Sequence, residues 1–185
     1  MNPISRRLMF LGPLGLLAVG GGAGALLLHR MADGSFDPRG VPSVLIDKPA
    51  PKFSLAPQAG HPGFDGAALV TAGTPVLINF FASWCLPCIA EAPQLLALQK
   101  RGLQIWGVAY KDREESTARF LAQHGNPFSR IARDAEGNAA LEFGVYGVPE
   151  TYLIDKTGIV RWRWVGALSD NVIARALDPL LAKYA

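Results

Sequence analysis

A thiol pair at the junction of a buried strand and a helix constrains the fold more than any other feature of the chain. The apolar run 75–82 has the length and composition of a buried strand. Residues 85–88 read Cys-Leu-Pro-Cys, and a helix is predicted from about Pro87 to Lys100, ended by Gly102. A strand that passes directly into a helix through a C-x-x-C indicates an α/β domain with its two thiols at the start of that helix.

The other patterns predict alternating strands and helices. Strands are expected at 53–56, 103–109, 151–155 and 159–165, and helices at 114–124 and 169–184, the last one kinked at Pro179. The order strand, helix, strand, helix implies right-handed βαβ units. The short connection between the last two strands predicts an antiparallel hairpin. The expected fold is therefore a mixed central sheet flanked by helices.

The first thirty residues differ from the rest. Residues 8–28 carry no charge, and as a helix they would reach roughly 30 Å, the thickness of a bilayer core. Arg6 and Arg7 precede them and favour an orientation with the N-terminus inside. We expect residues 1–30 to form a single-pass anchor in the inner membrane, with a soluble domain facing the periplasm. A cleaved signal peptide is the alternative.

Residues 31–51 are rich in proline and glycine and predict a linker, followed by one domain over 52–185. The formal net charge of +3 comes from the three arginines that flank the apolar segment. The remaining fifteen Lys and Arg balance fifteen Asp and Glu, so the domain lacks the basic footprint of a nucleic-acid-binding protein. Two cysteines and three scattered histidines make a zinc site improbable, so no cofactor beyond the Cys85–Cys88 disulfide is expected.

The thiol pair itself predicts redox chemistry. At a helix N-terminus, unpaired N–H groups and the helix dipole favour the thiolate, so Cys85 is expected to be exposed and nucleophilic. Cys88, one turn further in, is expected to resolve the mixed disulfide. Pro87 holds the turn, and Trp84 provides an apolar collar or simply packs there. A purely structural disulfide is the alternative.

A second segment, residues 144–151, places Pro149 directly before a predicted strand. Only about one X–Pro bond in twenty is cis, so this pattern alone leaves open whether Pro149 is cis or ends the preceding helix.

Four segments together carry a resemblance. Residues 79–88 resemble the active-site segment of thioredoxin-like proteins, and residues 144–155 resemble their cis-proline segment. With 107–112 and 120–128, they are similar to the DsbE/CcmG type of thiol:disulfide interchange protein from cytochrome c maturation. The resemblance covers about residues 50–183.

The resemblance implies a thioredoxin-like fold with an N-terminal strand extension and a βα-type insertion from Lys111 to about Asp134. It implies that Pro149 is cis and faces the disulfide, and that Val148 presents its backbone to an extended substrate. Cys85 and Cys88 take the nucleophilic and resolving roles.

The function implied by the resemblance is reduction of the disulfide of apocytochrome c, or of a haem-ligation partner that carries it. Electrons would come from a membrane thiol relay of the DsbD or CcdA kind. Two alternatives stay open at this point: a protein that donates disulfides, and a tethered holdase that grips extended cysteine-containing chains.

Asn79 stands where cytoplasmic thioredoxins commonly have a buried aspartate, and asparagine cannot titrate. Another acid must then move protons for the inner thiol, or none does. Glu91, one turn past Cys88, is the first candidate and Glu150, beside Pro149, is the second. The alternative for each is an ordinary surface carboxylate. Ile89 departs from relatives that often have a basic residue there.

Overall fold

The computed structural model describes residues 19–26, 28–29 and 43–184. They belong to two separate units, of which the second holds residues 43–184. In the first unit, residues 19–26 and 28–29 are helical. Within the described ranges, no helix is long and apolar enough to cross a bilayer. Much of the anchor predicted over 8–28 lies outside the described residues, so it stays a prediction.

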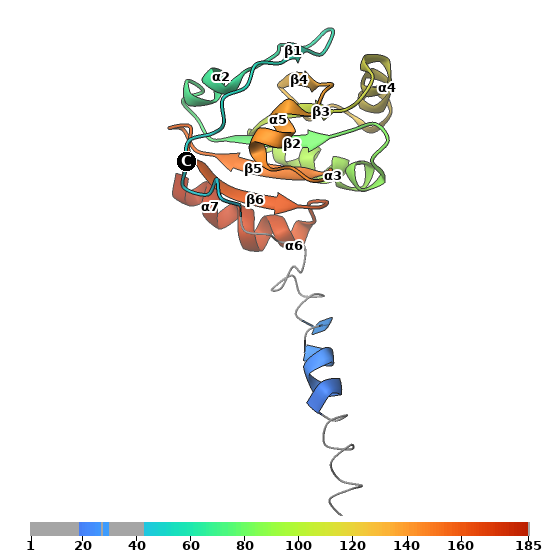
Figure 1. Cartoon of the computed structure of the whole chain (residues 1–185), viewed down its shortest axis with the longest axis vertical. Coiled ribbons are helices and arrows are strands. Elements are labelled where there is room, and N and C mark those ends of the chain that lie inside the picture. The colour runs from blue at the N-terminus through green and yellow to red at the C-terminus, as the bar shows by residue number, and fades with distance from the viewer. Residues whose placement is uncertain (1–18, 27, 30–42, 185) are drawn as a thin grey trace, which may run out of the picture. The chain divides into compact units, whose positions relative to one another are not determined.

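The domain is built on one mixed sheet of six strands in the order β1-β4-β3-β2-β5-β6 (Figure 1). The strands are β1 Ala56–Pro57, β2 Val76–Phe81, β3 Gln104–Tyr110, β4 Arg130–Asp134, β5 Glu150–Ile154 and β6 Val160–Val165. Strands β2, β3 and β4 are parallel, whereas β1, β5 and β6 join their neighbours antiparallel. The mixed sheet and the β5–β6 hairpin confirm the predictions from sequence.

Helices cover both faces of this sheet (Figure 1). They are α2 Gly66–Val70, α3 Leu86–Lys100, α4 Glu114–His124, α5 Asn138–Phe143, α6 Asp170–Val172 and α7 Asp178–Tyr184. Along β2, Leu77 and Phe81 pack in the cluster that includes α3 and the C-terminal helices, while Ile78 and Phe80 pack on the opposite face with α2 and α5. Burial on both faces explains why β2 is an unbroken apolar run.

The C-terminal helix passes through Pro179 by means of a π-helical turn, Ile173–Leu177. The N–H of Asp178 donates to the C=O of Ile173, five residues back. This wider turn lies directly before the proline, which has no N–H and cannot make an ordinary helical hydrogen bond. The irregularity predicted at Pro179 therefore precedes it by one turn.

Several elements differ from the sequence-based expectation. The strand expected at 53–56 is only the two residues of β1, shifted to Ala56–Pro57. Helix α2 had no predicted counterpart and is capped by Asp65, whose Oδ1 accepts a 2.9 Å hydrogen bond from Ala68 N–H. The residues of strand β4 were not specified beyond the predicted insertion, and helix α5 had no predicted counterpart. These elements are short, and short elements leave too few residues to display a period.

The predicted insertion contains α4 and β4, and β4 extends the sheet beyond β3. Strand β1, the N-terminal extension, pairs in turn with β4. The N-terminal extension and the insertion, both implied by the resemblance, therefore pair with each other at one edge of the sheet.

Residues 43–51, assigned to the linker by their composition, contact the domain at β6. The N–H of Asp47 donates to Val160 C=O at 2.8 Å, and the N–H of Ala50 donates to Gly158 C=O at 2.9 Å. The Arg161 guanidinium binds the carboxylates of both Asp47 and Asp155, each at 2.7 Å. This segment therefore forms part of the edge of the domain.

Candidate active site

The two cysteines form a disulfide at the point where β2 passes into α3. Cys85 and Cys88 are joined with an Sγ–Sγ distance of 2.04 Å. Cys85 is the N-cap residue of α3, and its Sγ accepts a hydrogen bond from the N–H of Cys88 at 3.1 Å. Pro87 stands in the first turn, where a missing N–H costs the helix no hydrogen bond. The strand, disulfide and helix thus follow one another as the sequence indicates.

The expected exposure of Cys85 is wrong in this oxidised form. Cys85 is 3% exposed and Cys88 2%, and both belong to the apolar cluster on the α3 face. The residues on either side of Cys85 are exposed instead, Trp84 at 59% and Leu86 at 77%. Partly buried apolar residues, including Val148, pack against this cluster. A reacting partner must therefore approach through a rim formed by Trp84 and Leu86.

Pro149 lies in the loop before β5, and the Val148–Pro149 peptide bond is cis, as the resemblance implied. Val148 packs against the cluster that contains Cys85 and Cys88. It precedes the first residue of β5, so its backbone stands outside the sheet ladder. The C=O of Pro149 accepts a hydrogen bond from Gly166 N–H at 2.9 Å, which fixes the start of the strand.

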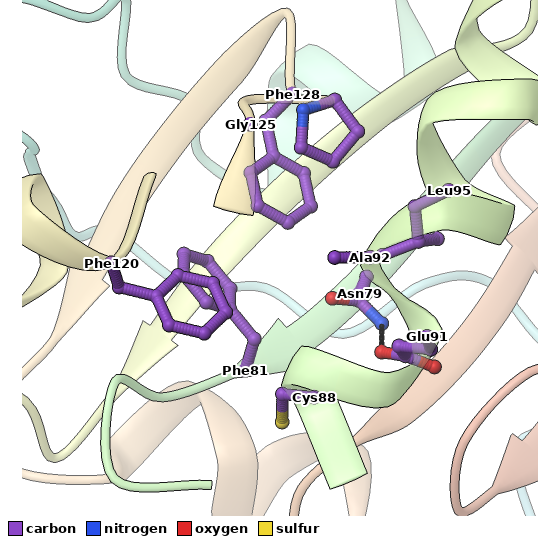
Figure 2. Close-up of a pocket in the computed structure, with 10 residues that line it drawn as sticks. Asn79, Phe81, Cys88, Glu91, Ala92, Leu95, Phe120, Gly125 and Phe128 are labelled. Atoms are coloured by element: carbon purple, nitrogen blue, oxygen red, sulfur yellow. Dashed lines mark hydrogen bonds between the residues drawn. The ribbon is translucent and has the colours of Figure 1, made fainter. Parts of the chain in front are cut away.

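Glu91 is a completely buried carboxyl group on α3. Its Oε1 accepts a hydrogen bond from Asn79 Nδ2 at 2.9 Å (Figure 2). Its Oε2 accepts one from Leu168 N–H at 2.9 Å. Burial raises the pKa of Glu91 from 4.5 to about 7, although the hydrogen bonds from Leu168 and Asn79 oppose this shift. The alternative of an ordinary surface carboxylate is therefore excluded for Glu91.

A small cavity connects this carboxyl group with the inner cysteine. Its volume is about 10 Å³, about the room that one water molecule needs. Cys88, Asn79 and Glu91 line it together with three aromatic rings, those of Phe81, Phe120 and Phe128. Asn79 Oδ1 has no hydrogen-bond partner within the described part of the chain, and in Figure 2 it points away from Glu91. A carboxyl group whose pKa is raised to about 7 and the inner cysteine thus line the same cavity.

Glu150 occupies a different environment from Glu91. Along β5, Thr151 accepts a hydrogen bond from Asn79 on the α3 side, at 3.1 Å. Glu150 and Tyr152 alternate with Thr151 and so point to the opposite face. There the carboxylate of Glu150 accepts hydrogen bonds from Arg163 Nε and from the hydroxyl of Tyr152. Glu150 is therefore a buried ion-pair partner and not a surface carboxylate.

Arg163 also reaches the loop that carries the cis-proline. Its Nη2 donates to the C=O of Gly144 at 3.2 Å, and its guanidinium lies 5.2 Å from the ring centroid of Tyr146. Burial and the hydrogen bond to Glu150 raise the pKa of the Tyr152 hydroxyl. The structure therefore favours Glu91 over Glu150 for proton exchange with the cysteines, and assigns Glu150 to the support of the 144–149 loop.

Two contributors had no role in the sequence-based reasoning. The N–H of Leu168, in the loop after β6, binds Glu91 from 77 residues away in the chain. Asp112 lies two residues after the end of β3 and binds Ser83, two residues before Cys85. An acidic residue just after a predicted strand was the available signal for Asp112. In the described ranges, no group of three or more His, Cys, Asp or Glu residues is placed to hold a metal ion.

The whole domain is similar in sequence to known proteins. The AhpC/TSA family matches residues 46–163. The chain is 38% identical to the thiol:disulfide interchange protein HelX of Rhodobacter capsulatus, over 97% of this chain and 98% of that protein. It is 42% identical to DsbE of Escherichia coli, over 88% of each.

Solved structures agree with these relatives. The crystal structure of a thiol:disulfide interchange protein of the thioredoxin family, from Chlorobium tepidum, superposes with a TM-score of 0.57 and 28% identity. It covers 74% of this chain and 94% of that one. The fold is thus thioredoxin-like. The chain belongs to the AhpC/TSA family and is a thiol:disulfide oxidoreductase of the DsbE/HelX type.

Proposed function

We propose that this oxidoreductase is a periplasmic reductase, anchored to the inner membrane by residues 8–28, that reduces the disulfide of apocytochrome c or of a haem-ligation partner. The resemblance of its active-site and cis-proline segments to the DsbE/CcmG type supports this assignment. The observation that carries it is Glu91, a buried acid with a pKa of about 7 that shares a cavity with Cys88.

The reaction proceeds in two exchanges. The Cys85 thiolate attacks one sulfur of the substrate disulfide, that S–S bond breaks, and the departing sulfur takes up a proton. Cys88 then gives its proton to the Glu91 carboxylate and attacks Cys85 Sγ. The mixed disulfide breaks, and the second substrate sulfur leaves as a thiolate that takes up a proton from solvent. Two electrons pass to the substrate and the Cys85–Cys88 disulfide remains. A membrane thiol relay of the DsbD or CcdA kind returns the two electrons.

The surroundings of the disulfide suit an extended polypeptide substrate. Trp84, Leu86 and Tyr146 are exposed apolar side chains on the segments that flank the cysteines and the cis-proline. The backbone of Val148 lies outside the sheet and is available to an added strand. A substrate cysteine within an apolar, extended segment is therefore the expected target.

Cys88→Ala tests the function directly, because it removes the resolving thiol and leaves the nucleophile. We expect this variant to accumulate a mixed disulfide with apocytochrome c or a haem-ligation protein, identified by mass spectrometry of non-reducing gels. Cys85→Ala, which keeps one cysteine but lacks the nucleophile, is the matched control. If Cys88→Ala forms no mixed disulfide and both variants hold the same partner without a covalent bond, the protein is a holdase that binds chains without exchanging thiols.

The direction of electron flow is tested by the equilibrium reduction potential of the full-length chain, titrated against glutathione. A value near or below that of thioredoxin, about −270 mV, is expected for a reductase. A value near that of DsbA, about −120 mV, would assign the protein to disulfide formation. Loss of cytochrome c in a Cys88→Ala strain, with general disulfide formation unchanged, is the expected outcome in cells.

A further inference from the structure

The side chain of Asp112 is hydrogen-bonded both to the loop before Cys85, at Ser83, and to the first turn of α4, at Thr117. Its Oδ2 accepts hydrogen bonds from Ser83 N–H at 2.7 Å and from Thr117 Oγ1 at 3.0 Å. Its Oδ1 accepts hydrogen bonds from Ser83 Oγ at 2.8 Å and from Arg113 N–H at 2.8 Å. Four donors fill the acceptor sites of a carboxylate, which is the ionised form.

The next residue of the same loop is held from the same place. Trp84 Nε1 donates to the C=O of Lys111 at 3.4 Å. Lys111 has a positive φ of 46° and its N–H donates to Asp134 C=O at 2.9 Å. Both residues that precede Cys85 are therefore attached to the 111–112 segment, where the insertion begins.

We propose that Asp112 is a positioning residue for thiol–disulfide exchange: its carboxylate fixes Ser83 and places a negative charge beside the nucleophile that opposes the Cys85 thiolate. The α3 N-terminus favours this thiolate, and Asp112 counteracts part of that effect. Ser83 and Cys85 are two residues apart, so the charge lies within roughly one Debye length of the sulfur. A less stable thiolate makes the reduced pair a stronger electron donor.

The neighbouring cations of the insertion have partners of their own. Lys111 is exposed, and its Nζ lies 5.3 Å from the ring centroid of Tyr110. Arg113 is exposed and faces Glu115, with 3.9 Å between Nε and Oε2. Among these groups, only the carboxylate of Asp112 is hydrogen-bonded to the loop of the nucleophile.

Charged groups on the other elements around the disulfide are accounted for separately. Glu91, on α3, is buried beside Cys88 and is hydrogen-bonded to Asn79 and Leu168. Glu150 is paired with Arg163 on the opposite face of the sheet. Asp112 is therefore the fixed charge on the Cys85 side of the disulfide, within the described part of the chain.

The test compares Asp112→Asn with Asp65→Asn in the full-length reduced chain. Both substitutions remove one negative charge, but Asp65 caps α2, before β2, whereas Cys85 follows β2. Asparagine is as good a cap as aspartate, so α2 is preserved. We expect Asp112→Asn to lower the pKa of Cys85, measured by the ultraviolet absorbance of the thiolate. We expect its equilibrium with glutathione to move about threefold toward the reduced form, and Asp65→Asn to match the wild type.

Ser83→Ala separates charge from geometry, because it removes one hydrogen bond to Asp112 and keeps the carboxylate. The pKa of Cys85 should then stay at the wild-type value. An unchanged or higher pKa in Asp112→Asn overturns the proposal, and so does an equal shift in Ser83→Ala.

A measurement on the wild-type chain covers the case in which Asp112→Asn does not fold. The carboxyl carbon of Asp112, labelled with carbon-13, is followed by NMR as a function of pH. In the reduced protein it should show an inflection at the pKa of Cys85, and in the disulfide form that inflection should vanish. Identical curves for the two forms overturn the proposal.

Discussion

The side-chain amide of Asn79 on β2 donates a 2.9 Å hydrogen bond to the buried carboxyl group of Glu91 on α3. A second hydrogen bond, from Asn79 to Thr151 at 3.1 Å, fixes the orientation of the amide. Because asparagine cannot titrate, Glu91 is the group in this pair that can hold or release a proton. Its properties can therefore be measured without a competing acid on β2.

Glu91 should make the stability of the protein depend on pH. Its pKa in the folded chain, about 7, is higher than its ordinary value of 4.5, so the folded state binds the proton more tightly than the unfolded state. The stabilisation is complete below about pH 4.5 and decreases as the pH rises to 7, by an amount of the order of 3 kcal/mol. Glu91→Gln should remove this dependence and unfold at higher urea concentrations than the wild type at pH 8.

The urea titrations are made on the oxidised chain, in which neither cysteine titrates. Glu115→Gln is the control, because the side chain of Glu115 is 70% exposed. If Glu91→Gln and the wild type lose stability in parallel between pH 5 and 8, Glu91 does not titrate as described.

The same substitution should slow the second exchange step and not the first. Attack by Cys85 needs no proton from Glu91, whereas Cys88 must lose its proton before it can attack. We expect the mixed disulfide to decay about a hundredfold more slowly in Glu91→Gln at pH 7, a usual effect of removing a general base. Acid quenching followed by mass spectrometry measures both steps. Normal decay of the mixed disulfide would exclude Glu91 as the proton acceptor.

Substitutions of Arg163 and Glu150 should have strongly non-additive effects on the free energy of unfolding. Arg163→Met leaves the carboxylate of Glu150 completely buried without its cation, and such losses cost about 3–5 kcal/mol. Glu150→Gln added to Arg163→Met should restore most of this stability, because no charge is then left in the interior. Urea unfolding of the two single variants and the double variant gives the coupling energy. Additive losses would contradict a buried ion pair.

Asp155 should stabilise the β5–β6 hairpin in an acid-sensitive way. Burial alone would raise its pKa, but hydrogen bonds from Thr157 and Arg161 outweigh burial and lower the pKa from 3.8 to about 2. The stabilisation is therefore complete above pH 4 and is lost as the pH falls through 2. Asp155→Asn should cost about 2 kcal/mol at neutral pH and nothing near pH 1. Thermal unfolding of the wild type and Asp155→Asn between pH 1 and pH 7 measures the difference in stability between them. A difference that does not change with pH would contradict the prediction.

The elements that could be predicted are those determined by residues close together in the sequence. The strand at 75–82, the helix that begins at its C-x-x-C and the hairpin at 156–158 each follow from local periods and turn residues. Pro149 needed more than its own position, because a single proline does not show which isomer is present. The resemblance supplied that information.

The polar contacts of the site could not be predicted in the same way. Glu91 was a candidate by its distance from Cys88 along α3, but its burial depends on Leu168, 77 residues away. The partnership of Ser83 and Asp112 spans 29 residues and exists only because β2 and β3 lie side by side. The face to which Glu150 points depends on where β5 begins, since a shift of one residue reverses it.

Strand β1 at the edge of the sheet has a consequence for solubility. It has only two residues, and its second, Pro57, has no N–H to offer to a neighbouring chain. Long, open edge strands promote association between molecules and fibril growth, and short ones that contain proline prevent it. At β1 the sheet therefore ends in an edge that is too short, and has too few N–H donors, to pair with a strand of another molecule.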